Sequence, residues 1–232
     1  MDLLELEQGI DPAAHWYYRA KAEALKRALR QQGHVPQLVK DVGAGSGYFS
    51  SVLLQAFPES RAICIDPNYD DGQLSQSSER QMFRRDGGPE VADLHLLMDV
   101  IEHVPDDAAL INEYVEDAPQ GSLFFVSVPA FEFLWSGHDV FLGHYRRYTL
   151  RQAERVVRSC GLTVLSGRYL YGSTFPLVAG VRLVKRRRGD VGSDMTSPST
   201  VTNSVLDRVM SVENRWRGNR VAGSTAIVVA RK

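Results

Sequence analysis

Three glycines two residues apart, Gly43, Gly45 and Gly47, constrain the fold of this chain more than any other feature. They follow the apolar residues 38–42 and precede residues 48–56, whose apolar positions have helical spacing. A strand, a glycine turn and a helix in this order open a doubly wound α/β domain, whose ligand lies at the carboxyl ends of the strands. Glycine permits the tight turn and lets a ligand approach the backbone. We therefore predict an α/β, Rossmann-like fold.

An acidic residue lies at or near the end of each of three apolar runs: Asp41, Asp66 and Asp99. At one rim these carboxylates would repel the pyrophosphate of a dinucleotide. They would attract S-adenosylmethionine (SAM), which carries a sulfonium and an ammonium against one carboxylate. Asp66 also lies about two dozen residues after the first glycine, where an acid accepts both ribose hydroxyls. The dinucleotide motif needs a small residue where this chain has Tyr48, so we expect SAM rather than NAD.

Two segments resemble class I SAM-dependent methyltransferases: Asp41-x-Gly-x-Gly-x-Gly47 followed by Asp66, and Asp99-Val-Ile-Glu-His-Val-Pro-Asp106. The second is similar to a motif of the ubiquinone-pathway O-methyltransferases and their bacterial relatives. The resemblance covers residues 12–170 and the final strand. It implies a seven-stranded, mostly parallel sheet with an antiparallel final strand, expected at the sheet edge, and S-adenosylhomocysteine (SAH) as product. The expected cofactor-binding residues are Asp41, Gly43, Gly45, Gly47, Asp66, Pro67, Asp86 and Asp99, with Asp86 as the nearest match to an acid beside the adenine.

A metal ion is a second interpretation of the segment that begins at Asp99. The motif is similar to one that binds Mg²⁺ in the quinone O-methyltransferases, which would make Asp99, Glu102 and His103 ligands. In the alternative, which we favour, Asp99 serves SAM and the other two residues cap the helix that follows. No metal site is therefore assigned from the sequence.

Composition narrows the partners and the compartment. The chain has 232 residues, 44% of them hydrophobic, and a formal net charge of -1, so no overall positive field favours nucleic acid. Its two cysteines, Cys64 and Cys160, are expected to be buried thiols in a reducing cytoplasm. No apolar run reaches the roughly 18 residues of a spanning helix.

We expect a single domain in four parts: a helical lid (1–33), a SAM-binding core (34–171), a helical insertion (172–223) and the final strand (224–232). The lid helix is predicted to start with Asp11 as its N-cap and to stop at Gly33. Within it, Arg19 or Lys21 could meet the methionine carboxylate of SAM. The insertion is predicted to hold helices over 176–187 and 205–216, joined by a polar linker.

Methyl transfer to a hydroxyl requires alignment, exclusion of water and removal of a proton, for which histidine is the usual base. One of His103, His138 and His144 is the expected base, with Tyr145 beside them. The loop after the fifth strand is rich in aromatic residues, and we expect its side chains to form the acceptor pocket. The expected acceptor-binding residues are Phe131, Trp135 and Asp139.

Together these patterns predict a SAM-dependent methyltransferase acting on a small-molecule or lipid-linked acceptor, more often at oxygen than at nitrogen or carbon. The alternative is a protein that binds SAM or SAH without turnover.

An apolar segment, 175–184, runs into the basic residues 185–188. This order also suits a helix lying on anionic lipid, so peripheral contact with the inner membrane face is a further expectation. In the alternative interpretation, the basic run is simply an exposed, solvated surface of the helix.

Overall fold

The computed structural model describes residues 9–188, 192, 198–215 and 218–232, and for residues 184–188 it describes the backbone alone. One seven-stranded sheet has the order β3-β2-β1-β4-β5-β7-β6. The strands are β1 (Leu38–Val42), β2 (Arg61–Ile65), β3 (Gln81–Arg84), β4 (Leu94–Met98), β5 (Leu123–Pro129), β6 (Thr163–Leu170) and β7 (Thr225–Arg231). The first five strands are parallel, and β7 runs antiparallel to both of its neighbours. The predicted mostly parallel sheet with an antiparallel final strand is confirmed.

The expectation that the final strand lies at the sheet edge is wrong. β7 pairs with β5 on one side and β6 on the other. Six of its seven residues are buried, whereas most of β6 is exposed or half-buried. A continuous run of small and β-branched residues suits a strand covered on both faces, so β7 lies inside the sheet and β6 forms the edge.

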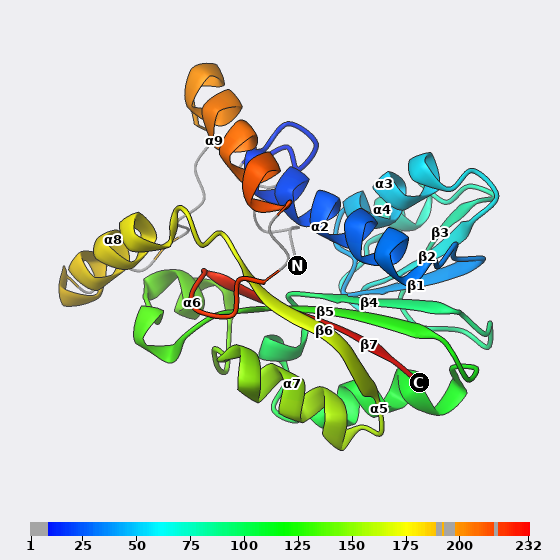
Figure 1. The fold of residues 1–232 in the computed structure, drawn as a ribbon. Helices are drawn as coiled ribbons and strands as arrows, with labels where there is room; N and C mark the ends of the chain where they lie inside the picture. The colour runs from blue at the N-terminus through cyan, green and yellow to red at the C-terminus, as the bar shows by residue number, and fades with distance from the viewer. Residues whose placement is uncertain (1–8, 189–191, 193–197, 216–217) are drawn as a thin grey trace.

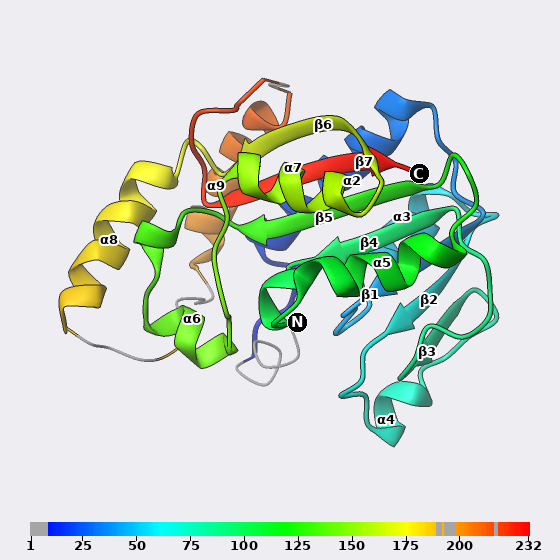
Figure 2. The ribbon, with the colours of Figure 1, turned by 90° about the horizontal axis from the view of Figure 1, so that it is seen from below.

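Helices cover both faces of the sheet (Figures 1 and 2). α2 (Trp16–Gln32) and α3 (Tyr48–Ala56) lie on one face, and α5 (Asp107–Asp117) and α7 (Leu150–Ser159) on the other. The shorter helical segments are α4 (Asp71–Leu74), η1 (Ile101–His103), η2 (Glu132–Leu134) and α6 (Gly137–Leu142). This is the two-sided layering that a doubly wound sheet requires.

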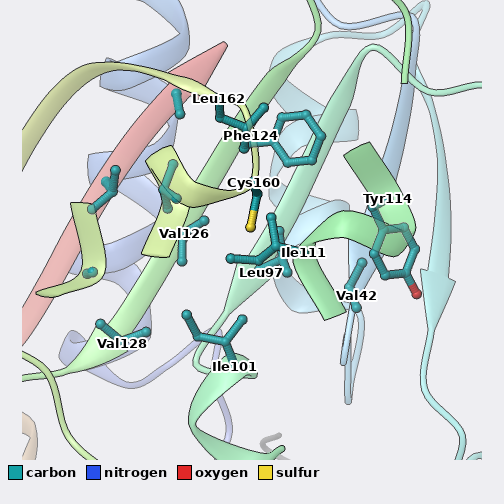
Figure 3. Packing of buried hydrophobic residues seen from close by; sticks show 14 of the residues in the cluster. Val42, Leu97, Ile101, Ile111, Tyr114, Phe124, Val126, Val128, Cys160 and Leu162 are labelled. Carbon is teal, nitrogen blue, oxygen red and sulfur yellow. The ribbon is translucent and has the colours of Figure 1, made fainter. Parts of the chain in front are cut away.

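β5 shows how one strand supplies both cores. Phe124, Val126 and Val128 face α5 and α7, as Figure 3 shows for this cluster. Leu123 and Phe125 belong to the cluster on the α2 and α3 side. Successive side chains of a strand point to opposite faces, so an unbroken apolar run fills two layers.

The first described helix begins later than the sequence suggested. Asp11 accepts a hydrogen bond from the backbone N–H of Ala13 at 2.9 Å and so closes a separate turn. α2 then starts at Trp16, with His15 as N-cap accepting from the Tyr17 N–H at 3.2 Å. The predicted end is confirmed, because Gly33 adopts the left-handed conformation of a C-cap.

The insertion contains two helices, α8 (Phe175–Arg188) and α9 (Thr200–Glu213). α9 begins five residues before the predicted start, because Ser199 caps it by accepting from the Thr202 N–H at 3.2 Å. α9 lies along α2, whereas α8 extends away from the sheet (Figure 1). Among the described residues, no helix combines the length and the apolar character needed to cross a membrane.

Candidate active site

The glycine turn is held in a conformation that larger residues would disturb. Gly43, Gly45 and Gly47 have φ angles of 62°, 53° and 69°. A Cβ atom on Gly43 would lie 2.6 Å from Cγ2 of Val100. The Gly45 N–H donates to Oδ2 of Asp66 at 3.3 Å, so the turn after β1 is tied to the acid after β2.

A cavity of about 1000 Å³ opens at the carboxyl ends of β1, β2 and β4. Five of the predicted cofactor-binding residues line it: Gly43, Asp66, Pro67, Asp86 and Asp99. Asp70 and Glu113 add two more carboxylates to its wall, against one guanidinium, that of Arg85. This excess of negative charge favours a ligand that carries positive charge.

Three other predicted residues shape the site from behind its wall. Asp41, Gly45 and Gly47 are not among the residues that line the cavity. Asp41 is buried and accepts a hydrogen bond from the Ser50 hydroxyl at 2.7 Å. This bond fastens β1 to α3, so Asp41 fixes the position of the glycine turn.

Asp99 is bound by groups of the protein itself. It has a φ of 54°, in the left-handed region, and its carboxylate forms an ion pair with Lys21 of α2. Its Oδ1 also accepts from the Ser127 hydroxyl at 3.1 Å. The Lys21 ammonium lies 4.6 Å from the ring centroid of Tyr17. The carboxylate of Asp99 is therefore directed at Lys21 and Ser127.

The ion pair also bears on the predicted contact with the methionine carboxylate. Lys21 faces Asp99, and Nε of Arg19 donates to Asp207 of α9 at 3.1 Å. Both basic side chains are thus engaged by acids of the protein. No residue of α2 lines the cavity, and the helix reaches its wall through the Lys21–Asp99 pair.

Glu102, which is buried, forms a cluster beside this wall with the half-buried His103 and His144. One carboxylate oxygen and one nitrogen of each imidazole lie within 4.8 Å of one another. The two rings have centroids 4.7 Å apart and an interplanar angle of 81°. Burial raises the pKa of Glu102 to about 8. Burial, together with the neighbouring His144, lowers the pKa of His103 to about 4, so His103 is neutral at pH 7.

Asp139 holds His144 in place. It is fully buried, and its Oδ1 lies 2.8 Å from Nδ1 of His144. Arg147 donates to both carboxylate oxygens, at 2.7 and 3.0 Å, and the Ser136 N–H donates at 2.9 Å. Asp139, predicted to contact the acceptor, therefore orients a histidine.

The other predicted catalytic and acceptor-binding residues lie outside this cluster. His138 is buried in α6, and Tyr145 is 58% exposed. Phe131 stacks on Tyr169 with centroids 4.9 Å apart, and Trp135 is half-buried. The structure thus brings together two of the three candidate histidines.

Some residues of the site were missed from the sequence. Asp70 and Arg85 follow the carboxyl ends of β2 and β3, where the rule for doubly wound sheets could have found them. Lys21 was predicted to contact the cofactor, but its ion pair with Asp99 gives no sequence signal, because 78 positions separate the two residues.

The comparisons with known proteins agree with this architecture. No protein-family model matches the sequence. Over 153 residues the chain is 29% identical to an uncharacterized methyltransferase of Mycobacterium leprae, an alignment that covers 62% of this chain and 55% of that protein. The chain thus spans about half the length of the curated relatives it matches.

Alignments with solved structures cover a larger share of this chain than the sequence match does. The plantazolicin methyltransferase BpumL, in complex with SAH and a monoazolic desmethylPZN analog, has a TM-score of 0.58 at 12% identity, covering 94% of this chain and 84% of its own. The chain described here has a class I methyltransferase fold. A SAM-dependent methyltransferase of Archaeoglobus fulgidus has a TM-score of 0.53 at 13% identity, covering 91% and 94%. Human N-acetylserotonin methyltransferase, in complex with SAM, has a TM-score of 0.53 at 13% identity, covering 94% and 52%. The resemblance to class I methyltransferases noted in the sequence is confirmed.

Proposed function

We propose that this protein transfers a methyl group from SAM to an oxygen atom of a small-molecule or lipid-linked acceptor. The observation that carries the proposal is the acidic cavity at the carboxyl ends of β1, β2 and β4, bordered by Gly43 and Asp66. SAM brings a sulfonium and an ammonium, so a wall rich in carboxylates attracts it. Asp66 would accept the ribose hydroxyls, and Asp86 would lie near the adenine.

Methyl transfer from SAM requires mainly that the protein aligns the donor sulfur, the methyl carbon and the acceptor oxygen. The methyl carbon moves from sulfur to the acceptor oxygen, the electron pair of the broken bond stays on sulfur, and the acceptor loses its proton. Holding the two reactants in line and excluding water lowers the barrier most. The position of His103 on the cavity wall and of His144 beside it supports a role for this pair in activating the acceptor. The single histidine base stays a prediction.

Two exposed apolar surfaces support a lipid-linked acceptor. On α9, Asn203, Asp207 and Met210 face α2, whereas the opposite side exposes valines. This pattern is the reverse of an ordinary surface helix, whose apolar side faces the core. The exposed apolar residues of the two insertion helices are Leu177, Val181 and Leu183 on α8 and Val201, Val205, Val209 and Val212 on α9.

An apolar face combined with nearby positive charge favours contact with an anionic membrane surface. The basic residues 185–188 follow the exposed apolar positions of α8 in the sequence, although their side chains lie outside the described part of the structure. We therefore extend the proposal to peripheral contact with lipid through α8 and α9. A hydrophobic tail on the acceptor would use the same surface.

Calorimetry with the full chain tests the cofactor. SAM and SAH should bind, and tighter binding of NAD than of SAM would reject the proposal. Transfer of a tritiated methyl group from SAM to a catechol, with and without a prenyl tail, tests the reaction. Label in the catechol ether supports oxygen transfer, and stronger labelling of the prenylated probe supports the lipid-linked acceptor. Tight SAM binding without labelled product from any hydroxyl, amine or thiol probe would favour the silent alternative.

A further inference from the structure

Four side-chain atoms in the Glu102, His103 and His144 cluster have no hydrogen-bond partner among the described residues. Both carboxylate oxygens of Glu102 and Nε2 of each histidine are buried and unpartnered among the described residues. Glu102 is 0% exposed, and the side chain of His144 is 4% exposed. A buried carboxylate with no partner is costly, so this arrangement needs an explanation.

The hydrogen bonds around the cluster fix which nitrogen of each ring faces inward. Nδ1 of His144 is paired with Asp139 at 2.8 Å, which leaves Nε2 as the free lone pair. The backbone carbonyl of Leu142 accepts a hydrogen bond from the His103 ring, whose Nε2 is likewise unpartnered. Histidines that bind metal ions are held in this way, with the outer nitrogen donating to a carboxylate or a carbonyl.

The ring N–H groups of both histidines thus point away from the space between these groups. Two imidazole lone pairs and the carboxyl group of Glu102 face one another there. A cation satisfies all three at once, whereas a water molecule could donate to only two. Metal–ligand bonds of roughly 2.0–2.2 Å would be reached from the present separations by shifts under about 1 Å.

This donor set differs from the one that the sequence motif implied. Asp99 was an expected Mg²⁺ ligand, but its carboxylate is directed at Lys21 and Ser127. His144, which lies 41 positions after His103 in the sequence, completes the set instead. Mg²⁺ prefers oxygen ligands, whereas two imidazoles and one carboxylate suit Zn²⁺, Fe²⁺ and related ions.

We propose that Glu102, His103 and His144 bind a divalent transition-metal ion, with Asp139 as the positioning residue for His144. His103 also lines the cofactor cavity, so the ion would lie at the wall where we place the acceptor. Bound there, it would supply a Lewis acid for the acceptor, and both histidines would then be ligands rather than bases. The site does not depend on the proposed methyl transfer.

Cobalt titration of the full chain tests this site. The protein is stripped with a chelator, desalted and titrated with Co²⁺, while visible absorption reports nitrogen ligation and calorimetry gives the stoichiometry. We expect one ion per chain. His144→Gln and Glu102→Gln should each weaken binding at least tenfold, and Asp139→Asn should weaken it 10- to 100-fold. His34→Ala, at a half-buried histidine that lies beside Asp93 and outside the cluster, should leave binding unchanged.

Thermal melts and SAM binding of each variant show whether it is folded, and metal binding is compared only among folded variants. Stoichiometric binding of Mg²⁺ without binding of Co²⁺ would overturn the proposed donor set. Absence of any Co²⁺ binding, or binding that the His144 and Asp139 variants leave unchanged, would overturn the site itself. SAM affinity of the stripped protein is measured separately, so loss of the metal proposal does not affect the proposed function.

Discussion

Lys21 and Asp99 form a buried ion pair that joins α2 to the carboxyl end of β4. Their side chains are 1% and 6% exposed. Because removal of one partner leaves the other charge buried, we expect Lys21→Met to lower the free energy of unfolding by about 3–5 kcal/mol. Denaturant unfolding measures this effect. The double variant Lys21→Met with Asp99→Asn should recover a large part of the loss, and strict additivity of the two changes would contradict a direct pairing.

We expect Asp66→Asn to weaken SAM binding by at least tenfold. The carboxylate would accept ribose hydroxyls, and each hydrogen bond to a charged acceptor contributes roughly 1.5–3 kcal/mol. The Gly45 and Asn68 N–H groups donate to different oxygens of Asp66, so asparagine keeps an acceptor for one of them, and a thermal melt of the variant checks that the turn is intact. Calorimetry with SAM reports the change, and the exposed Glu59→Gln is a matched charge control. Equal affinity in the Asp66 variant would contradict the assigned ribose contact.

We expect His144→Ala to lower kcat for methyl transfer by about 10²–10⁴-fold, whether His144 removes the acceptor proton itself or holds the ion that activates the acceptor. SAM affinity should stay within a few-fold, because His144 is not among the residues that line the cavity. Initial rates of label transfer to a catechol and calorimetry with SAM separate the two effects. His138→Ala is the comparison variant from the same loop. An equal loss of kcat in both variants would contradict a specific catalytic role for His144.

His95 makes stability depend on pH. It is 2% exposed and stacks on Phe124, with centroids 4.5 Å apart. Burial, with a smaller effect of Lys40, lowers its pKa to about 4, against about 6.5 in the unfolded chain. The unfolded state therefore binds the proton first as pH falls. The stabilisation from neutral His95 is complete above pH 6.5 and is lost between about pH 6.5 and 4, by at most about 3 kcal/mol.

His95→Phe should remove this contribution, so unfolding free energies of wild type and variant should converge or cross as the pH falls through that window. The raised pKa of Glu102 acts in the opposite direction as pH changes, which is why the difference between the two proteins is the quantity to measure. A constant difference from pH 7 to pH 4 would contradict the lowered pKa, because it would mean that His95 takes up its proton equally readily in the folded and unfolded states.

We expect the combined change Val201→Ser, Val205→Ser and Val212→Ser on α9 to weaken binding to vesicles of anionic lipid. These side chains are 74%, 53% and 66% exposed, so their replacement removes apolar contact with lipid without opening the core. Cosedimentation measures the bound fraction. Neutralising residues 185–188 should weaken binding to anionic vesicles more than to neutral ones. Equal sedimentation of variants and wild type would remove the membrane proposal, and SAM affinity should be unchanged throughout.

Much of the fold could be predicted because local patterns specify it. The apolar runs that become β1, β2 and β4 are buried along almost their whole length, and the glycine turn has the conformation that its residues require. The position of β7 could not be read from its own sequence, because an apolar strand suits any interior place in the sheet. The predicted start of α2 was too early because both Asp11 and His15 can cap a helical turn. Asp11 closes a separate turn, and His15 is the N-cap of α2.

The candidate site was predictable only where it follows the ends of strands. Asp66 and Asp99 were found by that rule, and both line the cavity. The pairing of His144 with Glu102 and His103 depends on how the loop after β5 folds back, which hydrophobic periodicity does not report. The role of Asp139 behind His144 was missed for the same reason.

The contact between α9 and α2 links two parts of the molecule that the sequence places at opposite ends. Asn203 accepts from the Trp16 N–H at 3.0 Å and donates to the Ala14 carbonyl at 2.7 Å, and Asn214 donates to the Ala20 carbonyl at 2.9 Å. These polar bonds are directional and resist sliding of one helix along the other. A displacement of α9 by an arriving lipid would therefore pull on α2, and through Lys21 on the rim of the cofactor cavity. Movement of α9 at a lipid surface would thus be coupled, through two sets of polar contacts, to the position of Asp99 at the cofactor cavity.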